Sequence, residues 1–355
     1  MRLTENAKYM ADVRAVASLP LPFEKLQDAS IVISGGSGMI ASCLADVLMA
    51  KNMEPSSLNC RIYALGRNME RAAERFAPYM GSRHFTFLKC DVNEPLHLPI
   101  ENADYVFHAA SNTHPVAYAS DPIGTIMTNI TGTKNLLDFA ASAGAKRFVF
   151  ASSNEIYGEN RGDTELFDES YCGYIDCNTM RAGYPEGKRC GEALCQAYIR
   201  QKGLDAVIAR FTRSYGPSVK GDDSKAISQF IHKGVLGEDI VLKSEGRQYY
   251  SFTYVTDAVS GLLFCMLCGK KGEAYNIADA RSDITLRDLA SAIAEHAGTK
   301  VVFELPDEAE SAGYSRATKA RLDGSKLKKL GWSAAYDIKE GTRRTIDILR
   351  SLQPE

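Results

Sequence analysis

A tyrosine and a lysine that could carry out proton chemistry stand four residues apart in Tyr-Pro-Glu-Gly-Lys, residues 184–188. This spacing places both side chains on one face of a helix. Pro185 fits the first helical turn, where its missing N–H costs no bond, so we expect Tyr184 at the helix entrance. A nearby cation stabilises a phenolate, which makes Tyr184 with Lys188 a candidate proton acceptor for alcohol oxidation. Tyrosine and lysine are also common neighbours on an ordinary helix surface.

A second polar group follows the apolar segment 147–151 and reads Ser152-Ser153-Asn154-Glu155. The Ser153 hydroxyl could bond the substrate oxygen that Tyr184 deprotonates, and Glu155 could serve as a second acid or base. The alternatives are turn capping by the serines and a structural carboxylate bonded to backbone N–H groups. The predicted catalytic set is Ser153, Glu155, Tyr184 and Lys188.

A glycine-rich segment, Ser-Gly-Gly-Ser-Gly-Met-Ile-Ala at residues 34–41, lies between a predicted strand and a predicted helix. This is the context of a loop that binds the pyrophosphate of a dinucleotide at a helix N-terminus. Gly35 allows the tight turn, and Gly38 lets the backbone approach the phosphates. The alternative is an ordinary strand-to-helix turn. The predicted contacts here are Gly35, Ser37, Gly38, Met39 and Ile40.

Other strand ends complete the predicted dinucleotide site. The second strand ends in Leu-Gly-Arg-Asn, without the acidic residue that usually bonds the adenosine ribose. Arg67 could instead hold the 2′-phosphate of NADP, or be merely solvated, so NAD is expected and NADP stays open. The third and fourth strands contribute Asp91, Val92, Ala109, Ala110 and Ser111.

Short apolar segments alternate with longer helical ones up to residue 210. The predicted strands are 31–33, 61–65, 85–89, 105–108, 147–151 and 206–210, and the predicted helices include 41–51, 131–143 and 186–202. This alternation predicts an α/β fold, a Rossmann-type doubly wound parallel sheet covered by helices. After residue 210 the pattern is less regular, which predicts a smaller C-terminal α/β substrate-binding lobe.

This pattern divides the chain into three regions. Residues 1–28 contain a short amphipathic helix and a proline-marked linker, and are expected to form an N-terminal arm outside the main core. Residues 29–210 form the dinucleotide-binding domain with the Tyr/Lys helix. Residues 211–355 form mainly the substrate lobe, with a segment near 250–270 returning to the first domain.

Composition excludes several kinds of partner. The 355 residues carry 42 basic and 44 acidic side chains, a formal net charge of -2, and no run of like charge typical of nucleic-acid binding. No stretch predicts a transmembrane helix. Nine cysteines without a disulfide or zinc pattern, and a charged, broken N-terminus, predict a cytoplasmic protein without a metal site.

The order of these motifs resembles the extended short-chain dehydrogenase/reductase family, over about residues 30 to 345. The motifs are the glycine loop, Asn129, Ser152-Ser153, Tyr184/Lys188 and Arg210 with Tyr215-Gly216-Pro217. The Ser-x-Glu-Ile-Tyr-Gly loop, Tyr184-x-x-x-Lys188-Arg189 and Leu330-Gly331-Trp332 are most similar to UDP-glucuronate decarboxylases and sugar-nucleotide 4,6-dehydratases. The resemblance implies that Asn129 belongs to the cofactor site and proton relay; by itself it could equally be a helix cap.

The resemblance also implies a reaction in which bound NAD oxidises C4 of a nucleotide-activated sugar and later returns the hydride. The dehydratases carry Asp-Glu where this chain has Asn154-Glu155, and an amide cannot supply their acid. This favours a UDP-glucuronate decarboxylase-like lyase. The alternatives are a 4-epimerase, a 4,6-dehydratase, a net NADP-dependent reductase and an inactive dinucleotide-binding regulator.

Two departures from the family pattern fall on the substrate side. Arg213 stands where the family usually has asparagine, and Tyr250 stands two residues after Gln248, where arginine is frequent. Arg213 could grip a pyrophosphate or a sugar carboxylate, or form a structural ion pair. The predicted substrate contacts are Asn154, Arg213, Gln248 and Tyr250. Helices near 122–143 and 185–203 correspond to those that pair two subunits in a four-helix bundle, so the resemblance implies a homodimer.

Overall fold

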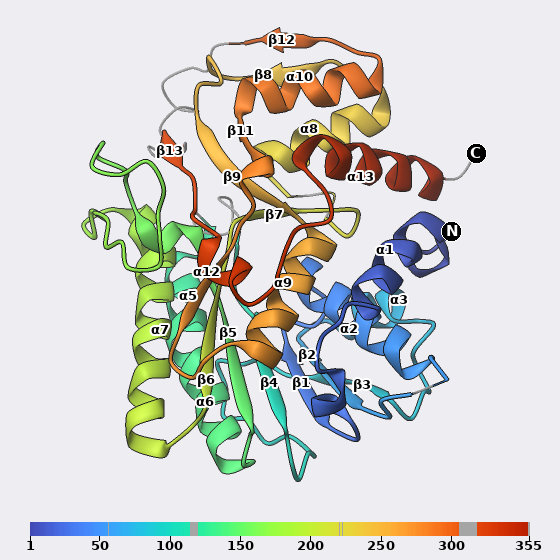
Figure 1. The fold of residues 1–355 in the computed structure, drawn as a ribbon, viewed down its shortest axis with the longest axis vertical. Coiled ribbons are helices and arrows are strands. Elements are labelled where there is room, and N and C mark those ends of the chain that lie inside the picture. Colours follow the sequence, from blue (N-terminus) through green and yellow to red (C-terminus); the bar gives the residue numbers. More distant parts are fainter. Residues whose placement is uncertain (56, 114–119, 220, 222, 305–317, 354–355) are drawn as a thin grey trace.

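The computed structural model describes residues 1–55, 57–113, 120–219, 221, 223–304 and 318–353, and its centre is a seven-stranded parallel sheet (Figure 1). The strand order is β10-β6-β5-β4-β1-β2-β3. The strands are β1 (Ser30–Ser34), β2 (Arg61–Gly66), β3 (Phe85–Lys89), β4 (Tyr105–His108), β5 (Arg147–Ser153), β6 (Ala206–Phe211) and β10 (Ala274–Ile277). The order reverses at β1 and β4, which confirms the predicted doubly wound α/β fold.

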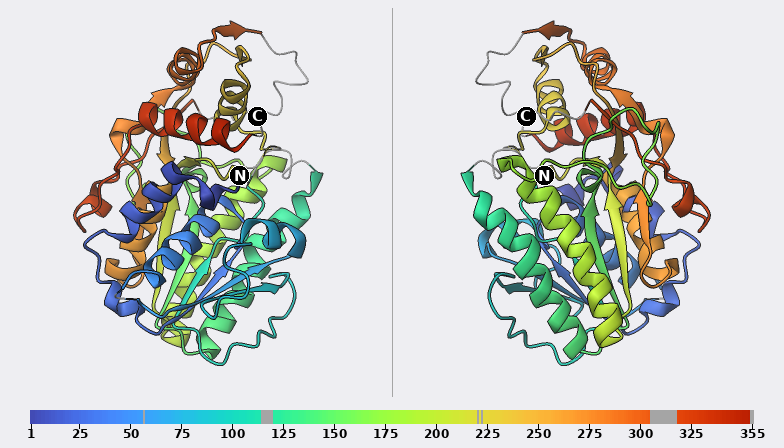
Figure 2. Two further views of the ribbon diagram at one scale, coloured as in Figure 1. Left: turned by 90° about the vertical axis from the view of Figure 1, so that its right-hand side faces the viewer. Right: turned by 90° about the vertical axis from the view of Figure 1, so that its left-hand side faces the viewer.

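Helices cover both faces of this sheet (Figure 2). On one face α2 (Met39–Asn52) packs against α9 (Val255–Cys268). On the other, α6 (Thr133–Ser142) packs against α7 (Gly183–Lys202), with α5 (Pro122–Met127) and a π-helical turn, η3 (Thr128–Gly132), before α6. All six side chains of β6 are buried, as expected for a strand covered on both faces. The short helix α3 (Met69–Arg75) contacts β3.

The smaller lobe lies beyond the carboxyl ends of these strands. Its main sheet has the order β11-β9-β13, with β7 pairing β9, and a separate pair joins β8 and β12. The strands are β7 (Arg213–Tyr215), β8 (Ile240–Leu242), β9 (Tyr249–Tyr254), β11 (Asp283–Thr285), β12 (Val301–Phe303) and β13 (Lys319–Ala320). The helices are α8 (Ala226–Leu236), α10 (Leu286–Ala297), α12 (Ser325–Lys328) and α13 (Ile338–Leu352).

Short 3₁₀ turns link several of these elements. They are η1 (Leu3–Glu5), η2 (Phe23–Leu26), η4 (Asn154–Tyr157), η5 (Met180–Ala182) and η6 (Ala280–Ser282). The turns η4 and η5 follow β5 and precede α7, so they approach the same end of the sheet. This end is where an open α/β sheet binds ligands.

The chain returns from the smaller lobe to the large sheet through α9 and then β10. The strand β10 pairs with β6 at the sheet edge, and α9 packs on β5, β6 and α2. The sequence did not predict β10, because four residues that include the polar Asn276 give too short an apolar pattern. The Asn276 side chain is buried and bonded to Tyr157, Phe167 and Asp323.

The expectation that the N-terminal segment lies outside the main core is wrong. Helix α1 (Ala7–Ala17) buries Tyr9, Val13 and Val16 in the large hydrophobic core and packs against α2 and α9. Its apolar residues recur at helical spacing and form one apolar face. The surfaces of α2 and α9 that cover this face come together only in the folded protein. The segment is therefore an integral element of the fold.

Candidate active site

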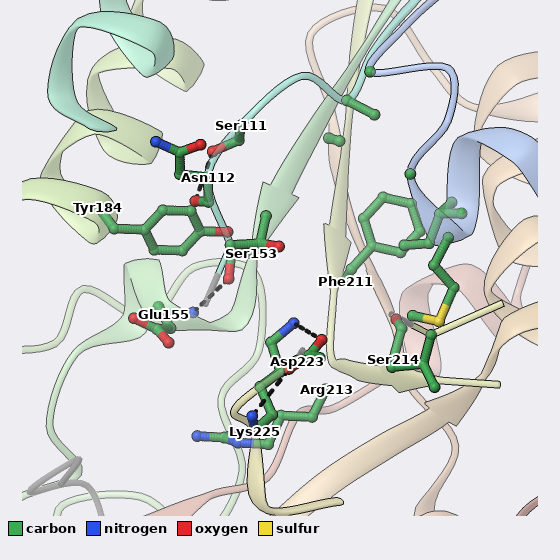
Figure 3. A pocket seen from close by; sticks show the side chains of 18 of the residues that line it. Ser111, Asn112, Ser153, Glu155, Tyr184, Phe211, Arg213, Ser214, Asp223 and Lys225 are labelled. Carbon is green, nitrogen blue, oxygen red and sulfur yellow. Dashed lines mark hydrogen bonds and ion pairs between the residues drawn. The ribbon is translucent and has the colours of Figure 1, made fainter. Parts of the chain in front are cut away.

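A cavity of about 700 Å³ lies between the large sheet and the smaller lobe. Its lining comes from the carboxyl ends of the large-sheet strands on one side and from β7, β9 and the start of α8 on the other. Figure 3 shows side chains from both halves converging on it. Nearly every side chain predicted for the site lines this cavity.

The residues of the predicted glycine loop line the cavity. Gly35 has a φ of 66°, and a Cβ there would lie 2.9 Å from the backbone of Ala110. Glycine is thus required at this position for two separate reasons. Gly38 is the N-cap of α2, and Ser37, Gly38, Met39 and Ile40 all line the cavity. The exposed helix N-terminus can accept an anion at this point.

A buried hydrogen-bond chain, which the sequence did not predict, fixes this loop against β4. Ser34 Oγ accepts the backbone N–H groups of Ala109 and Ala110 at 3.1 and 3.2 Å. It therefore donates its own proton to His108 Nδ1 at 2.8 Å. His108 Nε2 then donates to Thr133 Oγ1 at 3.0 Å, and Thr133 donates to the carbonyl of Asn129 at 2.6 Å. Burial and the charge of Lys188 hold the pKa of His108 well below its usual value, which keeps the imidazole neutral.

The predicted catalytic residues Ser153, Tyr184 and Lys188 come together at the end of β5. Figure 3 shows the Tyr184 hydroxyl beside Ser153, and the two side chains are hydrogen-bonded. Lys188 Nζ donates to the carbonyl of Ala151 at 2.8 Å, one turn below Tyr184 on α7. Ser152 is directed elsewhere, donating to Glu192, because successive strand residues point to opposite faces.

The pKa values differ from the expectation that Lys188 stabilises a Tyr184 phenolate. In the polypeptide alone, burial and the negative charge of Glu155 raise the pKa of Tyr184, and the bond from Ser153 opposes them. Burial lowers the pKa of Lys188 to about 7, against the opposing charge of Glu192. Lys188 is therefore close to losing its charge at neutral pH. Activation of the phenol needs a further positive charge beside it.

Glu155 lies next to this group at the start of η4. Its backbone N–H donates to Ser153 Oγ at 3.2 Å, and its carboxylate accepts from Arg181 Nη2 at 3.3 Å. Both side chains remain partly exposed to the cavity. The predicted neighbour Asn154 is buried and also lines the cavity. A single carboxylate therefore stands beside the phenol and an amide follows the serine.

Arg213 and Tyr250 form the facing wall. The Arg213 guanidinium lies 3.6 Å above the centre of the Tyr250 ring, and both residues line the cavity. The parallel pairing of β7 with β9 brings these strands side by side, with Arg213 opposite Phe252. Gln248 also lines the cavity and accepts a long bond from Ser244 Oγ at 3.4 Å. An aromatic face that carries a planar cation is suited to an anionic ligand.

The remaining predicted cofactor contacts lie along the strand ends. Arg67 is exposed at the end of β2, and the lining also includes Asp91, Val92, Ala109, Ala110 and Ser111. Asn129 is placed differently, buried behind the described lining. Its side chain donates to the Thr125 carbonyl at 2.8 Å and accepts from Ser111 Oγ at 2.9 Å. Asn129 thus touches the site through Ser111.

The sequence reasoning missed several lining residues. They include Arg181, Phe211, Asp223, Lys225 and Lys243. Arg181 had a usable signal, because it precedes Tyr184 by three residues on the same helical entrance. Asp223 and Lys225 lie in a loop before α8 and are joined at 3.5 Å, a pairing that carries no periodic signal.

Comparisons with known sequences identify the family of the protein. The sequence model of the NAD dependent epimerase/dehydratase family matches residues 31–278. The chain belongs to this family. It is 33% identical over 312 residues to UDP-glucuronic acid decarboxylase 3 of Arabidopsis thaliana, covering 88% of this chain and 86% of that protein. It is 30% identical over 332 residues to UDP-glucuronic acid decarboxylase 1 of Xenopus tropicalis, covering 93% and 75%. The predicted family resemblance is confirmed, and the protein is an enzyme.

Solved structures share the fold. A dTDP-glucose 4,6-dehydratase from Streptomyces venezuelae with NAD bound has a TM-score of 0.77 and 24% identity, covering 91% of this chain and 97% of that one. A UDP-glucuronic acid 4-epimerase from Bacillus cereus, in complex with UDP-glucuronic acid and NAD, has a TM-score of 0.76 and 19% identity, covering 91% and 100%.

The cofactor of this family enzyme is NAD, and the residues of the glycine loop fit it. The N-terminus of α2 at Gly38 offers polarity for a pyrophosphate that enters the cavity, and the absent Cβ atom of Gly35 lets the loop pack against the backbone of Ala110. The small side chains of Ala109 and Ala110 leave the adjoining wall open. In the part of the chain that the structure describes, no helix combines the length and apolar character needed to cross a membrane.

Proposed function

We propose that this enzyme decarboxylates UDP-glucuronate. The observation that carries the proposal is the set Ser153, Glu155 and Tyr184, with Asn154 where elimination would need an acid. The similarity to the decarboxylases of Arabidopsis thaliana and Xenopus tropicalis supports the same activity. When bound, NAD supplies the hydride acceptor for C4 of the sugar, the hydride that is returned, and a positive charge.

The first task of the protein is to remove the proton of the C4 hydroxyl. Tyr184 Oη accepts this proton while Ser153 Oγ orients the sugar oxygen, since the two side chains already share a hydrogen bond. Lys188 is fixed through Ala151 and holds one side of the phenol by its position on α7. Burial of Tyr184 excludes water from the proton transfer.

The second task is to direct the chemistry at C5 and C6 of the sugar. A ketone at C4 makes the C6 carboxylate a β-keto acid, whose C5–C6 bond breaks to release CO₂ and leave the electron pair as an enolate. The sugar then needs one proton at C5. Glu155 lies close enough to Tyr184 for its charge to raise the pKa of the phenol. It is therefore the acid–base group that we propose to deliver the proton to C5. Asn154 cannot protonate a leaving C6 hydroxyl, which disfavours 4,6-elimination.

The third task is to hold an anionic substrate. Arg213, supported on the face of Tyr250, supplies a cation to the sugar carboxylate or the pyrophosphate. From its position on β7, Arg213 supplies the positive charge that an arginine at position 250 would provide in other family members. Asn154, Gln248 and Tyr250 are the neutral contacts proposed beside it.

The test is to incubate the purified holoenzyme with UDP-glucuronate and follow CO₂ and the nucleotide sugar by NMR and mass spectrometry. We expect CO₂ and a UDP-pentose in equal amounts. Replacing Glu155 by Gln should slow pentose formation by about 10²-fold or more while leaving bound dinucleotide in place. A C4 epimer of unchanged mass, without CO₂, would show an epimerase and refute the proposal.

We also propose that two copies associate through α5 and α7. These helices pack against each other, and α5 presents Ile123 and Met127 to the surface with exposed fractions of 75% and 45%. Exposed apolar side chains on one helix of a packed pair favour a helix-bundle interface with a second copy. Sedimentation of the wild type against Ile123→Asp should show a dimer converted to a monomer; an unchanged sedimentation coefficient would refute this interface.

A further inference from the structure

Helix α1 lies between the two halves of the molecule and precedes the segment that the family model matches. In Figure 1 it runs between α2 of the large domain and α13 of the smaller lobe. It packs against both of these helices and against α9. Each half of the protein is bonded to a different buried side chain of this helix.

Asp12 makes the buried bonds to the smaller lobe, and Lys8 adds a more exposed ion pair with Asp347 of α13 at 2.7 Å. Its carboxylate is 2% exposed and accepts from Tyr254 Oη at 3.0 Å, Tyr336 Oη at 2.7 Å and Arg344 Nε at 3.1 Å. Tyr254 ends β9, Tyr336 precedes α13 and Arg344 lies within α13. A buried carboxylate depends on such partners, and the partners in turn lose their acceptor if it is removed.

Tyr9, one helical turn earlier, makes the bond to the large domain. Its hydroxyl donates to Asp46 of α2, which is fully buried and also accepts from Tyr79 Oη at 3.0 Å and Arg75 Nη1 at 3.2 Å. The helix α2 begins directly after Gly38 of the glycine loop. Tyr9 therefore connects α1 to the element that carries the dinucleotide site.

The bonds of Asp12 connect α1 equally directly to the cavity wall that Arg213 and Tyr250 form. Tyr254 pairs in register with Tyr215 of β7, two residues from Arg213. Within β9, Tyr254 follows Tyr250, whose ring supports that arginine. Helix α13 also packs tightly against Tyr215. A Cβ atom added at Gly341 of this helix would lie only 2.1 Å from Tyr215 Oη. A shift at Asp12 is therefore transmitted to both strands that carry Arg213 and Tyr250.

We propose that α1 is an inter-lobe clasp and that Asp12 is a positioning residue for the substrate. By joining Tyr254, Tyr336 and Arg344 to a helix that is itself bonded to Asp46, it fixes the Arg213–Tyr250 wall relative to the glycine loop. A substrate that must reach both Tyr184 and Arg213 depends on this spacing, whereas a dinucleotide at the glycine loop does not. The choice of UDP-glucuronate as that substrate rests on the proposed function.

The test compares Asp12→Asn with Arg14→Gln, a change at an exposed position of the same helix. In the full-length holoenzyme, Asp12→Asn should lower kcat/KM for UDP-glucuronate by about 10- to 100-fold, as expected for a misplaced substrate. The dissociation constant for NAD, measured by calorimetry on the protein freed of cofactor, should be unchanged. Arg14→Gln should resemble the wild type in both measurements.

Hydrogen exchange provides a second readout that needs no substrate. Asp12→Asn should accelerate amide exchange in residues 213–215 and 249–254 without accelerating it in β1. If Asp12→Asn does not fold, Tyr254→Phe and Tyr336→Phe, which each remove one bond, should show smaller changes of the same kind. Exchange unchanged in β7 and β9, a loss of NAD affinity equal to the loss of kcat/KM, or a lower melting temperature with normal kcat/KM would overturn the clasp. Absence of turnover in the wild type would refute the proposed function, and exchange alone would then decide the clasp.

Discussion

The two walls of the cavity are built on different principles. The cofactor wall consists of backbone and small side chains, with Gly35 packed against Ala110 and Gly38 at the start of α2. The substrate wall consists of long side chains, with Arg213 on Tyr250 and Asp223 paired to Lys225. A wall that is formed mainly by backbone atoms accepts one kind of ligand and tolerates few substitutions. A wall made of side chains can alter its ligand by single substitutions, which agrees with the departures from the family pattern found there.

The proposed catalytic residues stand between the walls, and their loss should have the largest effect. Tyr184→Phe removes the proton acceptor while keeping the ring, so kcat should fall by about 10²- to 10⁴-fold. NAD should remain bound, because its phosphate site is independent of the phenol. Steady-state kinetics with release and quantification of the dinucleotide would check this. A variant that keeps more than half of its activity would remove Tyr184 from the mechanism.

On the cofactor wall, Gly35→Ala should abolish dinucleotide binding. Gly144 offers a matched control, because it has the same φ of 66° with no atom within 4 Å of an added Cβ. Each alanine should cost about 1–2 kcal/mol for its backbone conformation, but only Gly35→Ala also collides with Ala110. Denaturant unfolding and calorimetric titration with NAD separate the two costs. Equal loss of affinity in both variants would contradict the close-approach argument.

On the substrate wall, Arg213→Ala should raise KM for UDP-glucuronate by about 10- to 100-fold, the equivalent of one or two charge-assisted bonds. The affinity for NAD should not change. Arg287→Ala is the control, since Arg287 also lies over an aromatic ring, that of Phe303, at 5.2 Å but does not line the cavity. Unchanged KM in Arg213→Ala would make this arginine purely structural.

The smallest expected effect concerns stability and pH. Because burial lowers the pKa of Lys188 to about 7, the unfolded chain binds one more proton there between about pH 7 and 10.5. Holding Lys188 therefore destabilises the fold at and below pH 7, and this penalty is relieved as pH rises. Lys188→Met should be inactive yet more stable than the wild type at pH 7, by an amount that shrinks toward pH 10.

Denaturant unfolding at several pH values would measure this difference. Lys146→Met is the control, because Lys146 is exposed and its pKa is raised by Asp104. That control should lose rather than gain a small stability at pH 7. A Lys188→Met advantage that does not vary between pH 7 and 10 would contradict the lowered pKa.

Part of the site was predictable because its signals are local. The glycine loop directly follows a strand, and Tyr184 and Lys188 share a helix face, so their positions follow from periodicity alone. Arg213 and Tyr250 were predicted individually, but their stacking depends on the parallel register of β7 with β9, which joins residues far apart in sequence. The chain from Ser34 through His108 to Thr133 was missed for the same reason.

Local sequence patterns were sufficient for six strands of the seven-stranded parallel sheet, the glycine loop and the Tyr/Lys pair, because each depends on short-range periodicity and backbone geometry. The course of α1, in contrast, is set by tertiary packing. Its apolar stripe is typical of an independent amphipathic helix, yet Tyr9 and Asp12 meet buried partners from three distant segments. Tertiary packing also sets the protonation of Lys188, because a pKa depends on burial and on neighbouring charges, neither of which is encoded at the residue itself.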